Sequence, residues 1–302
     1  MTDAASSDRC SIRARARGDV LAGTALPTRR FLLIEDPGPW GPQAHPTGTL
    51  PSEVVSVVHA VAHELSARLL LIRRPGRQAI SPQRAWAVAD IDIGEIRWGT
   101  TATVADLEDV DYFSGGTSTA ADTYLVCAQG RHDVCCAAEG RPVAAALARR
   151  LPESTWECSH VGGDRFAANV LVLPTGLVYG RVTPGDVDRL VTAQSDGLLI
   201  PDLLRGRCGI APVAQVAESY VREAWREFRS DAIDITSVAH LGHDVWRVNG
   251  QHAGDGREFV AELHEAHEPV ETGLTCAAVG AGHLRTWTVT LLEVEEPRTA
   301  QV

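Results

Sequence analysis

The chain has 302 residues, of which 44% are hydrophobic and 22% are charged, and its formal net charge is −11. This composition can bury a hydrophobic core, and the length favours two or three domains. Because proteins that bind nucleic acids need a basic face for phosphates, the acidic charge argues against nucleic acid as a partner.

The N-terminal residues and the cysteine count indicate where in the cell the protein is expected. Residues 1–20 are polar and lack an apolar signal-peptide segment, and no run approaches the roughly 18 apolar residues of a membrane span. Seven cysteines, an odd number, favour metal ligands or free thiols over a disulfide framework. We therefore expect a cytoplasmic protein with no membrane partner, which begins with a flexible tail over residues 1–28.

Residues 29–115 have the pattern of an α/β unit. Apolar residues at helical spacing predict a helix over residues 51–65, and a shorter helix is expected over 104–110. Strands are expected at residues 31–34, 69–72, 85–91 and 95–100. The order fits a second thioredoxin-like unit without ligands, in which only His59 and His63 could serve a metal. The alternative is an unrelated α/β unit that supports the next domain.

Residues 120–229 carry a second α/β pattern. Helices are expected over 141–151, where Pro142 suits a first turn, over 184–191 with Thr183 as the cap, and over 212–228. Strands are expected at residues 123–127, 155–158, 169–173 and 177–182, with a turn at Pro174-Thr175-Gly176. This βαβ and then ββα order predicts a thioredoxin-like domain.

Residues 231–302 shift towards short strands separated by glycine-rich turns, which predicts a small antiparallel β module. The strands are expected at residues 244–248, 258–263 and 286–294. Six of the 11 histidines lie here, including the pairs His240-x-x-His243 and His264-x-x-His267. Since these histidines have no cysteine partners, we expect exposed side chains rather than a metal site.

The residues with the strongest chemical signal lie between Cys127 and Asp164. Cys127, Cys135 and Cys136 fall within ten residues, and His160 follows on a loop with two glycines. Thiolates select zinc, copper(I) and iron–sulfur clusters, and imidazole suits zinc and iron, so the spacing leaves the metal open. We expect Cys136 close to a helix N-terminus, where the helix dipole favours a thiolate.

Three segments carry a resemblance to a known family: LLIEDPGPWG at residues 32–41, CAQGRHDVCCAAEGRP at 127–142 and WECSHVGGDRFAANVLVLPTGLVYGRV at 156–182. They resemble the sucrase/ferredoxin-like family, in a bacterial form, whose core is similar to thioredoxin-like 2Fe–2S ferredoxins. The resemblance extends over most of residues 30–225.

The resemblance implies a 2Fe–2S cluster held by two cysteines and by the two histidines of an H-x-G-G-H loop. Cys127 and Cys136 match the cysteine pair, and His160 matches the first histidine. Asp164 stands where the second histidine is expected. The implied ligand set is therefore Cys127, Cys136, His160 and Asp164.

The fourth ligand has three candidates. Asp164 has the register of the family ligand, although a carboxylate is a harder ligand than imidazole. Cys158 lies two residues before His160, so both side chains share a face of an extended strand. The third candidate ligand is solvent or a histidine from outside the loop. Cys135 is expected as a thiol near the site, and His132 as a neighbour of the ligands or an exposed residue.

The resemblance implies an electron-transfer or redox-sensing protein that works with an unknown reductase and an electron-acceptor protein. We expect an electron carrier rather than an enzyme. Sucrose hydrolysis is not expected, because nothing in the sequence singles out the two positioned carboxylates that it needs. The G-x-G-x-x-G and G-x-x-x-x-G-K nucleotide patterns are absent, which favours a separate reductase. Two alternatives remain. One is a thioredoxin-like thiol–disulfide oxidoreductase, although the chain lacks the C-x-x-C motif usual in that class. The other is a zinc-stabilised binding module.

Overall fold

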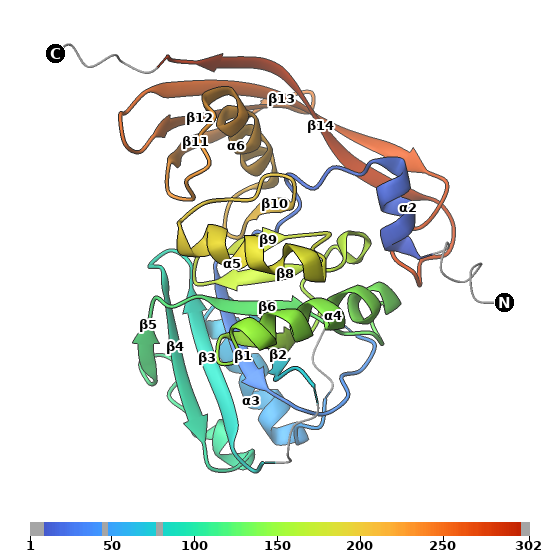
Figure 1. The fold of residues 1–302 in the computed structure, drawn as a ribbon, viewed down its shortest axis with the longest axis vertical. Coiled ribbons are helices and arrows are strands. Elements are labelled where there is room, and N and C mark those ends of the chain that lie inside the picture. Colours follow the sequence, from blue (N-terminus) through green and yellow to red (C-terminus); the bar gives the residue numbers. More distant parts are fainter. Residues whose placement is uncertain (1–8, 44–47, 77–80, 297–302) are drawn as a thin grey trace.

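The computed structural model describes residues 9–43, 48–76 and 81–296, which form a large mixed α/β body and a smaller β module (Figure 1). The large sheet has ten strands in the order β10-β9-β8-β6-β7-β2-β1-β3-β4-β5. The separate C-terminal sheet has four strands in the order β11-β12-β13-β14. The predicted α/β fold class with a small C-terminal β module is confirmed.

The first half of the large sheet has thioredoxin-like topology. Its elements are β1 (Arg30–Glu35), α3 (Ser52–Glu64), β2 (Ala67–Arg73), β3 (Arg84–Asp90), β4 (Glu95–Thr101), the 3-10 turn η1 (Ala105–Glu108) and β5 (Thr117–Thr119). Strands β1 and β2 are parallel and linked by α3, whereas β3 pairs antiparallel with β1, and β4 with β3. This gives the strand order β2-β1-β3-β4, a βαβ unit followed by a ββ hairpin.

The second half repeats this topology. Its elements are β6 (Thr123–Cys127), α4 (Val134–Arg150), β7 (Thr155–Cys158), η2 (Asp164–Phe166), β8 (Val170–Leu173), β9 (Leu177–Tyr179), η3 (Pro184–Asp186), α5 (Val187–Ser195) and β10 (Leu204–Arg207). Strands β6 and β7 are parallel, β8 pairs antiparallel with β6, and β9 with β8. The order β7-β6-β8-β9 matches that of the first half, so this thioredoxin-like core is also as predicted.

The two halves meet at β2 and β7, which pair antiparallel through Ile72 with Cys158 and Arg73 with Glu157. The pairing continues past β7, since Ser159 donates its N–H to the carbonyl of Leu71 at 2.8 Å and the Leu71 N–H donates to Ser159 Oγ at 3.0 Å. The first half therefore fixes the backbone immediately before His160.

Alternation along β6 separates its side chains into two cores. Leu125 and Cys127 face one core, and Tyr124 and Val126 face the other, beneath α4 and α5. Burial of each large apolar side chain in such cores contributes about 1.5–3 kcal/mol. Cys127 thus lies at the end of a strand whose position both cores hold.

The C-terminal module packs α6 (Pro212–Trp225) against an antiparallel sheet. Its strands are β11 (Ile233–Gly242), β12 (Val245–His252), β13 (Glu258–Val270) and β14 (Gly282–Val294). The prediction of short strands is wrong. Strands β13 and β14 have 13 residues each, and their pairing extends as far as Val270 opposite Gly282. This long hairpin reaches α2 (Cys10–Arg17) on the other side of the molecule (Figure 1).

The expected flexible tail over residues 1–28 does not hold for its described part, residues 9–28. This part begins with α2, where Cys10, Ser11 and Ala14 are buried. Small side chains let this arginine-containing helix pack closely despite its polarity. Residues 1–8 lie outside the described residues.

No helix in the described ranges combines the length and the apolar character that crossing a membrane requires.

Candidate metal centre

Cys127 is held at the end of β6 by its backbone and by α4. Its N–H donates to the carbonyl of Asn169 at 3.0 Å, and its side chain is 1% exposed. Gly140 of α4 lies against the Cys127 carbonyl so closely that a Cβ there would collide with the oxygen. The glycine thus lets the helix rest on the strand end that carries the thiol.

Cys136 lies in the first turn of α4 and is fully buried. The helix begins at Val134 rather than at residue 141, so the predicted helix start is wrong by two turns. The reason is Asp133, whose carboxylate caps the helix by accepting the N–H of Cys135 at 2.8 Å. Pro142 lies inside the helix instead of opening it.

His160 and Asp164 lie on the tight loop after β7. Gly162 (φ +83°) and Gly163 (φ +77°) adopt the left-handed conformation that glycine takes without strain. The turn brings the Asp164 carboxylate back to the imidazole, with Oδ1 3.0 Å from His160 Nδ1. Asp164 opens the short turn η2 and is 4% exposed.

Arg205 holds this loop, a role that no local sequence pattern indicates. Its buried guanidinium donates from Nη1 to the carbonyl of Gly162 at 2.9 Å and to Asn169 Oδ1 at 2.8 Å. Asn169 in turn donates from Nδ2 to the carbonyl of Gly163 at 2.9 Å. Burial lowers the pKa of Arg205 to about 10, and Thr24 accepts hydrogen bonds from its Nε and Nη2, so each guanidinium nitrogen has an acceptor.

The candidate ligands converge in two overlapping groups. The ligand atoms of Cys127, Cys136 and His160 lie within 4.8 Å of one another, and so do those of His132, His160 and Asp164. The groups are joined by His160 and by a hydrogen bond of 3.2 Å from Cys136 Sγ to Asp164 Oδ1. The structure therefore brings together all four residues of the implied ligand set.

His132 is closer to the site than the sequence indicated. Its ring stacks on that of His160 with centroids 3.9 Å apart, and its Nε2 lies 3.7 Å from Asp164 Oδ2. Cys158, the rival fourth ligand, is fully buried in the apolar core and belongs to neither group among the described residues. The geometry favours Asp164 over Cys158, with His132 beside it.

Gln129 connects the site to the first half of the molecule, a role that the sequence did not predict. Its Oε1 accepts the N–H of His160 at 2.7 Å, while its Nε2 donates to the carbonyls of Gly41 and Gln43, each at 2.7 Å. The carbonyl oxygen of Pro42 lies 3.0 Å from His132 Nδ1, within hydrogen-bond distance. The loop that begins in the LLIEDPGPWG motif therefore covers the site, which is why that distant segment belongs to the same pattern.

The four side chains shift one another's proton affinities. A hydrogen bond from Cys136, with help from His160, holds the pKa of Cys127 well below its ordinary value despite burial, and the same bond raises the pKa of Cys136. Burial lowers the pKa of His160, but Asp164 and Cys127 outweigh it and raise that pKa to about 9. Burial raises the pKa of Asp164, but its contact with His160 outweighs this and lowers it. The site thus favours a thiolate beside an imidazolium–carboxylate pair.

The donor set fits an iron–sulfur cluster. His160 Nδ1 is buried, and Asp164 Oδ1 lies 3.0 Å from it as its ion-pair partner. Two thiols supply the donors that iron–sulfur centres prefer, and an imidazole with a carboxylate can complete the set. Four buried ionisable side chains gathered at one point suit a metal centre better than an apolar core, because burying charged groups is costly.

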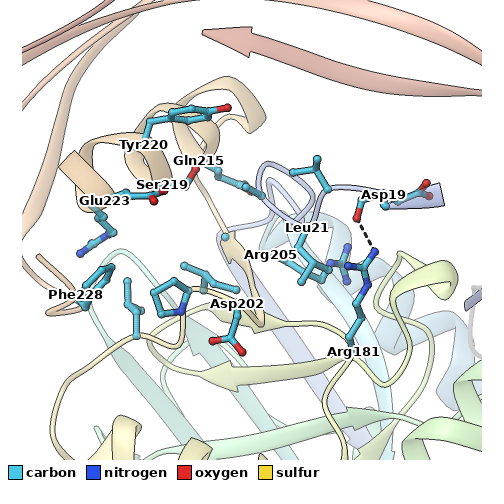
Figure 2. A pocket seen from close by; sticks show the side chains of 18 residues that line it. Asp19, Leu21, Arg181, Asp202, Arg205, Gln215, Ser219, Tyr220, Glu223 and Phe228 are labelled. Atoms are coloured by element: carbon cyan, nitrogen blue, oxygen red, sulfur yellow. Dashed lines mark hydrogen bonds between the residues drawn. The ribbon is translucent and has the colours of Figure 1, made fainter. Parts of the chain in front are cut away.

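A separate cavity of about 530 Å³ lies between β10, α6 and residues 18–22. Figure 2 shows Arg181 and Arg205 on one side of it and Ser219 and Tyr220 of α6 on the other, with a hydrogen bond from Arg181 to the carbonyl of Asp19. None of the described residues that line it is a candidate ligand. The candidate metal centre is therefore a buried site distinct from this cavity, and Arg205 lines the cavity while its guanidinium holds the site loop.

The chain is similar to one protein family and to several individual proteins. The sucrase/ferredoxin-like family matches residues 21–206. Two yeast proteins named altered inheritance of mitochondria protein 32 are similar, at 30% identity over 101 residues in Candida glabrata and 33% over 93 residues in Meyerozyma guilliermondii. These matches cover 28% and 27% of this chain and 32% and 33% of the yeast proteins, so the chain matches about a third of their length. Relatives from yeasts lend no support to the expected bacterial source.

Solved structures of a thioredoxin-like [2Fe-2S] ferredoxin from Aquifex aeolicus also match. A variant at 23% identity has a TM-score of 0.26 and covers 28% of this chain and 97% of that chain. Another structure of this ferredoxin, at 24% identity, has a TM-score of 0.25 and covers 28% of this chain and 88% of that chain.

The family match spans more than half of the chain. It contains both thioredoxin-like halves of the sheet, the covering loop and the four converging side chains Cys127, Cys136, His160 and Asp164. The chain belongs to the sucrase/ferredoxin-like family.

Proposed function

We propose that this protein is an electron-transfer or redox-sensing protein that carries one 2Fe–2S cluster on Cys127, Cys136, His160 and Asp164. The observation that carries the proposal is the convergence of two buried thiols and a buried imidazole, whose ligand atoms lie within 4.8 Å of one another. Family membership supports it, since the family name includes ferredoxin.

The chain's own residues would hold and tune such a centre. A bound 2Fe–2S cluster supplies a site that takes up and releases one electron, and histidine ligation raises its reduction potential. Gln129 and Arg68 fix the backbone of His160, at 2.7 Å to its N–H and 2.8 Å to its carbonyl. These bonds keep the imidazole aimed at the thiols.

The histidines also mark the side from which electrons would enter and leave. His160 is 9% exposed and the side chain of His132 is 22% exposed, whereas Cys127 and Cys136 are at most 1% exposed. A reductase and an acceptor protein would therefore dock over the two histidines. We also propose a cytoplasmic location, because none of the seven cysteines, which all lie in the described residues, forms a disulfide, and reducing compartments keep cysteines in this state.

The test is a visible absorption and EPR spectrum of full-length protein purified without oxygen, before and after reduction with dithionite. We expect a red-brown protein with two irons and two sulfides per chain, whose reduced form gives a spin-one-half signal. The average g value should differ from that of an all-thiolate cluster, because nitrogen and oxygen ligands are harder donors than sulfur. A protein that stays colourless after anaerobic reconstitution with iron and sulfide would contradict the proposal.

Matched cysteine variants separate ligation from packing. Cys127 and Cys208 are each 1% exposed and belong to the same apolar core. We expect Cys127→Ser to lose the visible absorption and Cys208→Ala to retain it. Equal loss in both variants would indicate damage to the core rather than removal of a ligand.

A further inference from the structure

Three segments that are far apart in the sequence meet beside the first turn of α4. They are α2, the turn that holds Asp133 and Cys135, and the loop of residues 271–281 between β13 and β14, which lies next to α2 in Figure 1. Each brings a cysteine, and Cys10 and Cys276 are separated by 266 positions. Such a convergence has no local sequence signature.

The four polar side chains lie at the spacing of ligands to one ion. Cys135 Sγ lies 3.6 Å from Cys10 Sγ and 3.4 Å from Cys276 Sγ, and Cys10 Sγ lies 3.6 Å from Asp133 Oδ2. All four ligand atoms lie within 4.8 Å of one another. Tetrahedral zinc, with bonds of about 2.3 Å to sulfur and about 2.0 Å to oxygen, separates two sulfurs by about 3.8 Å and sulfur from oxygen by about 3.5 Å.

We infer that Cys10, Cys135, Cys276 and Asp133 form a zinc site, separate from the proposed cluster. Three thiolates select a soft or borderline metal, and three sulfurs with one carboxylate fill the four positions of tetrahedral zinc. With no position left for a substrate, the site is structural rather than catalytic. Cys276 is half-buried while Cys10 and Cys135 are buried, so the ion has a path of entry from the C-terminal loop.

Hydrogen bonds around the four side chains orient them as in other metal sites. Asp133 accepts the N–H of Cys135 at 2.8 Å through Oδ1 and the N–H of Cys276 at 2.7 Å through Oδ2. The N–H of Cys10 donates to Cys276 Sγ at 3.3 Å. Arg13 holds the loop from the other side, since its Nη2 donates to the carbonyls of Gly273 and Thr275 at 3.2 and 3.3 Å.

The site is independent of the proposed cluster in two respects. Cys135 and Cys136 are consecutive on α4, where neighbouring side chains point about 100° apart, so that each faces a different group. Cys10 and Cys276 both lie outside residues 21–206, the part matched by the family. Zinc here would clamp the N-terminal helix and the long C-terminal hairpin onto the domain that holds the cluster.

The test is metal analysis of full-length protein prepared without oxygen, supplied with zinc and iron, and desalted. We expect one zinc per chain in the wild type, in Cys127→Ser and in the control Cys208→Ala, and loss of zinc in Cys276→Ser with iron retained. Cys276→His should recover zinc, because imidazole is also a zinc ligand. Cobalt(II) in place of zinc should give the sulfur-to-cobalt charge-transfer bands of a tetrahedral thiolate site.

Three results would overturn the inference. They are a wild type without stoichiometric zinc, zinc retained in full by Cys276→Ser, and a mass showing a disulfide among the three thiols in the oxygen-free protein. Cys127→Ser keeps this test apart from the proposed function, since zinc held in the cluster site would disappear in that variant and zinc held by Cys10, Cys135 and Cys276 would not.

Discussion

At the residue scale, the Asp164 carboxylate contacts two other proposed ligands, at 3.0 Å from His160 Nδ1 and 3.2 Å from Cys136 Sγ. An anionic ligand opposes the addition of an electron. Replacement by a neutral imidazole, Asp164→His, should therefore raise the reduction potential by on the order of 100 mV while the cluster stays bound. Potentiometric titration followed by EPR measures this shift.

Surface charge provides the control for this substitution. Asp196 is exposed at the end of α5, so Asp196→His removes the same charge where solvent screens it, and the potential should stay close to that of the wild type. An unshifted potential in Asp164→His would exclude Asp164 as a ligand. His132→Ala is then the next variant to examine, because His132 stacks on His160 and lies 3.7 Å from Asp164.

Gln129 gives a second prediction at this scale. Gln129→Glu keeps an acceptor for the His160 N–H but removes the two donors to the carbonyls of Gly41 and Gln43. Gly41 is buried, whereas Gln43 is exposed and water can reach its carbonyl. A buried acceptor left unpaired costs about 1–3 kcal/mol, so urea denaturation should show a lower free energy of unfolding by about that amount. Gln83→Glu, an exposed equivalent, should change it by less than about 0.5 kcal/mol. Equal values for both variants would mean that the covering loop is not held by Gln129.

At the element scale, the contact of α4 with β6 depends on Gly140, where a Cβ would collide with the carbonyl of Cys127. In an exposed helix, glycine to alanine stabilises by about 1 kcal/mol. Here we expect Gly140→Ala to destabilise by about 1–3 kcal/mol and to lower the iron content, because the helix must move away from the strand end. Ala138→Ser, on the exposed face of α4, is the control. A stabilised Gly140→Ala would contradict this account of the packing.

The elements also separate what the sequence can predict from what it cannot. Strands β6 and β7 were predicted with their observed bounds, because buried runs rich in apolar and β-branched residues leave few alternatives. The start of α4 was missed because one capping carboxylate, Asp133, decides it. Strands β13 and β14 were underestimated because their charged residues interrupt the alternation.

The candidate site divides in the same way. The sequence motifs and the family resemblance predicted that Cys127, Cys136, His160 and Asp164 lie together, as the structure shows, and their binding of a metal stays a prediction. The roles of Gln129, Arg205 and the trio Cys10, Cys135 and Cys276 could not be predicted, because they depend on tertiary contacts across up to 266 positions.

At the scale of the whole molecule, the two thioredoxin-like halves share one sheet through β2 and β7. Trp98 of the first half stacks on Trp156 of the second with centroids 5.5 Å apart, and Arg73 pairs with the nearly buried Glu157 at 2.7 Å. We therefore expect the halves to unfold together. In native-state hydrogen exchange, peptides from β1 and β6 should share one opening free energy. Exchange of β1 at a clearly lower free energy than β6 would show that the halves open separately.

The same joint bears on association between copies of the chain. An uncovered edge strand exposes a row of N–H and C=O groups with which another molecule can pair, and this is a common route to aggregation. In this sheet β2 and β7 cover one another, and the outer positions go to β5, with three residues, and to β10, with four residues and a register shift between Leu204 and Gly206. Because these two edge strands are short and one is irregular, they offer few N–H and C=O groups for pairing with a strand of another molecule. Joining the two halves edge to edge therefore protects the ten-stranded sheet from pairing with a strand of another molecule.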